Sequence, residues 1–110
     1  MVQTITTKAP LNVARMATGR YLDTGTVAAY TFSDLGFKPR YVKVQNLAAT
    51  GAMLEWYEGM ADASAVKKVT AGDMTVITTL GITVTSRGFT FGLDTDANVT
   101  SEKVSWLALG

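Results

Sequence analysis

The fold class is decided by one stretch in the middle of the chain, KPRYVKVQNLAATGAMLEWY (residues 38–57). Within residues 40–45 polar and apolar side chains alternate, with Val42 and Val44 on one face. Residues 52–57 continue this pattern after a short loop. Strict alternation with a period of two is typical of half-buried β-strands. The stretch therefore predicts two consecutive strands, each with one face toward a core.

The rest of the chain supports the same structure class. Thr and Val are abundant, ten Gly residues separate short runs, and no segment has a convincing helical period. Further strands are expected at residues 27–32, 65–70, 74–79, 82–85, 89–93 and 103–109. About eight short strands with turn residues between them predict an all-β fold, an antiparallel β-sandwich or a jelly-roll-like barrel.

The chain is expected to form one domain preceded by an arm. Residues 1–20 are polar at first and then ambiguous between a strand and a helical turn, so they are assigned to an N-terminal arm. Residues 21–110 are assigned to the β-sandwich domain. A chain of 110 residues matches the usual size of a single domain.

The composition excludes most chemistry. The chain has no Cys and no His, which removes disulfides, thiolate nucleophiles, imidazole bases and nearly all transition-metal sites. We therefore expect a protein that is not an enzyme and needs no cofactor. Only 17% of the residues are charged, against about 25% in average soluble domains. Either a Thr-rich surface replaces charges with hydroxyls, or a homo-oligomer hides apolar surface between its copies, and the strand pattern favours the oligomer.

Two predicted strands are apolar on both faces. Leu107 and Leu109 lie opposite Trp106, and Met53 and Tyr57 lie opposite Trp56, although one face of a monomeric sandwich should be polar. A second subunit or a folded-back arm would cover the outer face. A homo-oligomer is expected, and trimers are common among such sandwiches, although the pattern alone does not set the number of subunits. The predicted interface residues are Met53, Tyr57, Leu107 and Leu109, together with Ile5 and Leu11 of the arm.

Two residue clusters suggest ligand sites. Asp94, Asp96 and Asn98 have the spacing that opens a calcium loop, but the later positions lack the required Gly and Glu, so an ordinary turn is the favoured interpretation. Tyr41, Tyr57 and Glu55 could bind a glycan, because a tyrosine ring can stack on a sugar and a nearby carboxylate can accept its hydrogen bonds. Exposed tyrosines are also common on β-strands.

The charge pattern argues against nucleic acid and membrane partners. The net charge is +1, and Lys67-Lys68 is the only adjacent basic pair, which is expected to be a solvated strand edge. No apolar run approaches the ~20 residues of a bilayer-spanning helix. The first residues lack the order of a signal peptide, so assembly in a cytoplasm is expected.

Several motifs resemble those of small β-sandwich virion structural proteins of tailed bacteriophages. The similar segments are GFKPRYVKV (36–44), EWYEGM (55–60), GITV (81–84), RGFTFGLD (87–94) and VSW (104–106). The resemblance begins at Gly36 and leaves the first third of the chain uncovered. It implies a virion structural protein, assembled in the host cytoplasm, that decorates or cements a capsid as a homotrimer through subunit and shell contacts. The alternative that it leaves open is a lectin-like receptor-binding module of a tail fibre that binds a host glycan.

Overall fold

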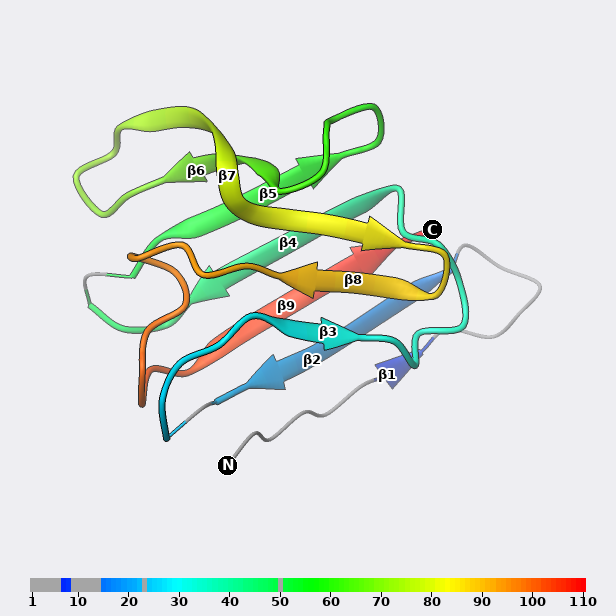
Figure 1. Cartoon of the computed structure of the whole chain (residues 1–110), viewed down its shortest axis with the longest axis horizontal. Helices are drawn as coiled ribbons and strands as arrows, with labels where there is room; N and C mark the ends of the chain where they lie inside the picture. Colours follow the sequence, from blue (N-terminus) through cyan, green and yellow to red (C-terminus); the bar gives the residue numbers. More distant parts are fainter. Residues whose placement is uncertain (1–6, 9–14, 23, 50) are drawn as a thin grey trace.

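The computed structural model describes residues 7–8, 15–22, 24–49 and 51–110, and these form strands, turns and loops without a helix (Figure 1). The strands are β1 (Thr7–Lys8), β2 (Met16–Tyr21), β3 (Tyr30–Phe32), β4 (Tyr41–Asn46), β5 (Met53–Tyr57), β6 (Ser64–Lys68), β7 (Met74–Thr85), β8 (Gly88–Phe91) and β9 (Val104–Leu109). They make one sheet in the order β1-β2-β9-β4-β5-β6-β7-β8-β3, and all neighbours are antiparallel. The prediction of an all-β antiparallel fold is confirmed; the strands form a single curled sheet.

The sheet curls because β7 bends. Its first half pairs with β6 and its second half with β8, and the register jumps between Ser64↔Ile82 and Ala65↔Ile77. Leu80 has a positive φ of 62° at the bend, and a Cβ on Gly81 would lie 2.7 Å from the Ser64 carbonyl oxygen. The sequence predicts two strands separated at this point, and the structure has one bent strand. The bend carries β8 and β3 back across β9 and β2 (Figure 1).

The hydrophobic core lies between the two limbs of this curled sheet. The predicted alternation is confirmed in the central strands, because Val42, Val44, Leu54 and Trp56 are all buried. Aromatic rings connect the limbs: the Phe32 ring of β3 and the Phe89 ring of β8 lie 5.0 and 5.2 Å from the Trp106 ring of β9. Such tilted and edge-on ring pairs add to the free energy that burial provides.

The boundary between an arm and the domain, expected after residue 20, falls inside β2. Met16–Tyr21 pairs with β9 along its whole length, from Met16↔Leu109 to Tyr21↔Val104. Small side chains let this segment join the sheet without a recognisable apolar pattern: Ala17 is fully buried, and Gly19 lies opposite Trp106.

Three other strand predictions need correction by two residues or more at their ends. The strand expected at residues 65–70 is Ser64–Lys68. Only Tyr30–Phe32 of the strand expected at residues 27–32 is a strand. β8 ends at Phe91, so Leu93 does not share the buried face of Phe89 and Phe91 and is 38% exposed. Within the described ranges no helix has the length and apolarity needed to cross a membrane.

Candidate functional site

A row of apolar and aromatic side chains crosses the solvent side of the sheet. The row comes from four adjacent strands, because Met16 pairs with Leu109, Leu109 with Tyr41, and Tyr41 with Tyr57. Met16, Leu109 and Tyr57 are 38%, 37% and 47% exposed, and Tyr41 is half-buried. We call these four side chains the outer row. Their sequence neighbours Ala17, Val42, Trp56 and Ala108 are buried in the core, so the two sides of the sheet are both apolar here.

All four predicted interface residues of β5 and β9 lie on the solvent side of the sheet, which we call the outer face. Tyr57 and Leu109 belong to the outer row itself. Leu107 is half-buried in the next row, paired with Thr18 and Lys43. Met53 is half-buried one row further on. Their role in an interface stays a prediction, and Ile5 and Leu11 lie outside the described residues.

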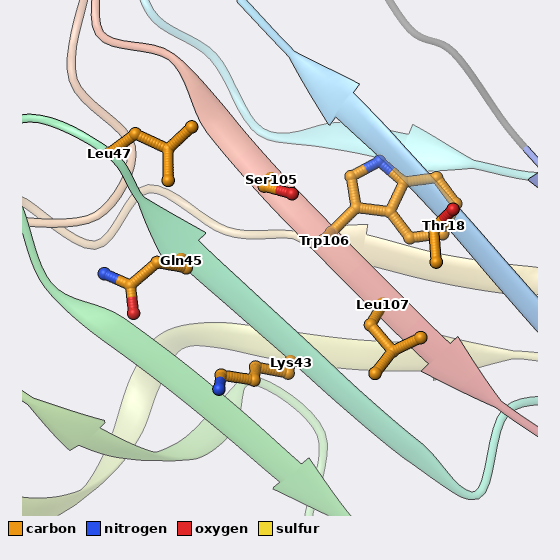
Figure 2. Close-up of a pocket in the computed structure, with 7 residues that line it drawn as sticks. All are labelled: Thr18, Lys43, Gln45, Leu47, Ser105, Trp106 and Leu107. Atoms are coloured by element: carbon orange, nitrogen blue, oxygen red, sulfur yellow. The ribbon is translucent and has the colours of Figure 1, made fainter.

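A shallow hollow of about 370 Å³ lies beside the outer row. Figure 2 shows the side chains around it, with the small Ser105 between Gln45 and the Trp106–Leu107 pair. Its lining residues are Thr18, Lys43, Gln45, Leu47, Ser105, Trp106 and Leu107. Leu47, which sequence reasoning did not single out, is 58% exposed. The hollow offers an apolar rim and a few neutral hydrogen-bonding groups, with one cation.

The three predicted glycan-binding residues meet at one end of the outer row. The rings of Tyr41 and Tyr57 lie 5.3 Å apart at an angle of 63°. Both tyrosine hydroxyls donate hydrogen bonds to Glu55 Oε2, that of Tyr57 at 3.4 Å. One carboxylate oxygen is thus shared by two phenols, and the ring of Tyr57 remains accessible.

The carboxylate changes the titration of both phenols. Burial, followed by the hydrogen bond to Glu55 and its charge, raises the pKa of Tyr41 well above the ordinary value. The charge of Glu55 is the main reason why the pKa of Tyr57 is also raised, followed by desolvation and the hydrogen bond. Both phenols therefore remain protonated donors over the whole neutral range.

The raised pKa of Tyr41 predicts a loss of stability in alkali. A group with a pKa higher in the folded state contributes stability that is complete below its unfolded value, here 10.0, and that is lost as the pH rises toward the folded value. We expect the free energy of unfolding, measured with urea, to fall above about pH 10 and to fall less steeply in Tyr41→Phe. Lys67 is present in both proteins, so its own alkaline titration cancels in the comparison. If the free energy of unfolding fell equally steeply with pH in the two proteins, this result would contradict a raised pKa of Tyr41.

Asp94 and Asp96, which were only weak candidates for metal binding, form ion pairs with a lysine side chain. Lys67 Nζ lies 3.0 Å from Asp94 Oδ1 and 2.6 Å from Asp96 Oδ2. Asp94 also accepts the backbone N–H groups of Asp96 and Ala97. Asn98 turns its amide donors to the carbonyls of Ala28 and Gly92. The carboxylates thus hold the cation of a side chain, and in the part of the chain that the structure describes no three acidic residues group as metal ligands would.

Lys67 is not the solvated residue that the sequence predicts. Its side chain is only 14% exposed. Burial alone would lower the pKa of Lys67, but the hydrogen bonds and charges of Asp96 and Asp94 outweigh it and raise that pKa. The side chain therefore fastens the loop after β8 to β6 as a permanent cation.

Asn46 is a further residue that sequence reasoning missed. It is almost completely buried. Its Nδ2 donates to the Ala97 carbonyl at 2.8 Å and to Glu102 Oε1 at 3.0 Å, while its Oδ1 accepts the Ala48 N–H. An amide at the core-facing position after Val42 and Val44 is the signal that could have identified it. Asn46 therefore ties the end of β4 to the loop that precedes β9.

Comparisons with known proteins add no relative. No family model, no curated protein and no solved structure matches the chain.

Proposed function

We propose that the chain is a structural protein of a tailed bacteriophage particle, a homo-oligomer that decorates or cements the capsid through its outer face. The observation that carries the proposal is the outer row, four apolar or aromatic side chains on the solvent side of four adjacent strands. The motifs at residues 36–44 and 87–94 support the choice of a virion protein, because they resemble such proteins.

The physical function of such a face is to bury apolar surface against another molecule. Apolar surface removed from water stabilises a contact by about 25 cal/mol per Å². A partner that binds only the folded chain also stabilises it by mass action. The outer face carries only the cation of Lys43 and the carboxylate of Glu55 near its centre, on neighbouring strands. Removing these two charged groups from water is costly although their charges are opposite, so a partner that fits this face must provide groups that pair with Lys43 and Glu55.

The size of the face indicates more than one contact per subunit. The register places three rows of four residues on the outer side of these four strands. A stable interface takes about 20–30 residues from each partner. The outer face therefore needs additional surface from the same subunit, as expected for a ring or for a subunit that also touches a shell.

A second candidate function rests on the tyrosine cluster. The accessible ring of Tyr57 can stack on the apolar side of a sugar, and Glu55 retains one carboxylate oxygen that accepts no hydrogen bond from either tyrosine. This arrangement favours the alternative of a receptor-binding module for a host glycan. The two functions predict different responses to substitution, because stacking depends on Tyr57 and not on Leu109.

The test compares binding of the purified chain to emptied heads of the phage that encodes it and to a glycan array. We expect saturable binding to the heads that Leu109→Glu weakens about tenfold or more, because a charge is placed in an apolar contact. The matched control is Ser86→Glu in the exposed β7–β8 turn, which should bind as the unmodified chain does. Head binding unaffected by Leu109→Glu, or glycan binding that Tyr57→Ala removes without head binding, would contradict the decoration role.

A further inference from the structure

The first half of β7 has a free edge. Met74 to Ile77 pair with β6 on one side, whereas β8 pairs only with Ile82 to Thr85 on the other. Figure 1 shows this half of β7 at the margin of the sheet, beyond β6, before the strand bends across to β8. Among the described residues, no strand pairs with residues 74–79 on the side that faces away from β6.

The pairing with β6 determines which backbone groups point outward. The Val69 N–H donates to the Asp73 carbonyl at 3.2 Å. In an antiparallel ladder, residues alternate between bonding one neighbouring strand and pointing away from it. The N–H and C=O groups of Met74, Val76 and Thr78 therefore face away from β6. They form a regular row of donors and acceptors that no strand among the described residues pairs with.

This edge lacks the features that keep edges of monomeric sheets apart. Such edges are protected by charged side chains, by proline or by a covering loop. Residues 74–79 read MTVITT, with no charge and no proline, and five of the six are β-branched. Met74 and Val76 are 62% and 63% exposed. The segment has the properties of a strand that adds to another sheet.

We propose that this edge binds the same edge of a second copy of the chain, with the two β7 strands antiparallel about a two-fold axis at Val76. The extended segment ends at two residues with positive φ, Gly72 (96°) and Leu80 (62°). Both lie four positions from Val76, so the longest self-pairing places Val76 opposite Val76. Met74 then faces Thr78 of the second copy, and no charged pair opposes another within residues 74–78.

The pairing also extends the outer face. Val76 lies beside Val66, and Met74 lies in the same row as Met53 through Lys68. Two copies joined at β7 would form one continuous sheet with their outer faces on the same side. The pairing of the two edges does not depend on the proposed function; only its use in a phage particle does. The pairing also adds contact surface to that of the outer face.

Cysteine cross-linking tests the pairing in the full chain. The sequence has no Cys, so Val76→Cys carries a single thiol. Facing Cα atoms in an antiparallel pair lie ~5.5 Å apart, within the ~4.4–6.8 Å that a disulfide spans. We expect Val76→Cys to form a covalent dimer under mild oxidation about tenfold or more faster than Ser86→Cys, because the pairing raises the effective thiol concentration. Equal rates would overturn the proposal.

Two further variants separate this contact from the outer face. Val76→Pro removes only an outward N–H, and Val76→Lys opposes two like charges while it keeps that N–H; each should reduce dimer mass in light scattering. Leu109→Glu should leave the Val76→Cys cross-link intact, while it weakens head binding and any subunit contact through the outer face. Unchanged dimer mass in both Val76→Pro and Val76→Lys would overturn the edge pairing, whereas loss of head binding alone would concern the proposed function.

Discussion

Gly88→Ala is expected to destabilise the protein by about 3 kcal/mol, because the new methyl group overlaps backbone atoms that cannot move independently. A Cβ at Gly88 would lie 1.6 Å from the Phe32 carbonyl oxygen. Phe32 belongs to β3, the strand that pairs with β8 through Phe32↔Phe89, and its ring packs in the core. Relief of the overlap would require β3 to separate from β8.

Urea unfolding measures this effect, with Gly59→Ala as the matched control. Gly59 has a φ of 102°, but a methyl group added there would meet no other atom within 4 Å. Its substitution should cost only the ~1–2 kcal/mol of a left-handed backbone. An effect at Gly88 no larger than that at Gly59 would contradict the close approach of β3 and β8.

Lys67→Met is expected to cost about 3 kcal/mol as well, because it leaves a buried carboxylate without its counter-ion. The side chain of Asp94 is 7% exposed, so water cannot replace the ammonium group. Two backbone N–H groups remain bonded to Asp94, which keeps the loss near the lower end of values for broken buried pairs.

The neighbouring lysine provides the control. Lys68 is exposed, on the strand face opposite that of Lys67, and Lys68→Met should change the free energy of unfolding by no more than about 0.5 kcal/mol. The two variants have the same composition and net charge. Equal losses, measured by urea unfolding near neutral pH, would show that the ion pair does not hold the loop.

Local patterns were sufficient to predict the central strands. Alternation in residues 40–45 and 52–57 identified β4 and β5 and the core positions of Val42 and Trp56, because burial of one face imposes a period of two. The bend of β7 was visible as a break at Leu80-Gly81. β2 was not predicted, because its core-facing positions include Ala17 and Gly19, which give little or no apolar signal.

Candidate sites were predictable only where they depend on neighbouring strands. Tyr41, Glu55 and Tyr57 meet because β4 and β5 form adjacent antiparallel strands, and both strands were predicted from their alternation. The pairing of Lys67 with Asp94 joins residues 27 positions apart, and no local pattern indicates which charges meet over that separation. The same holds for Asn46 and Ala97, 51 positions apart.

The central claim is that the outer face is covered by another molecule, and the mass of the purified chain in solution tests it most directly. Size-exclusion chromatography with light scattering at micromolar concentration should give a mass that is a multiple of the monomer mass. The same measurement on Leu109→Glu should give a smaller multiple, with an unchanged free energy of unfolding for each folded subunit. A monomeric mass for the unmodified chain across that concentration range would contradict the claim.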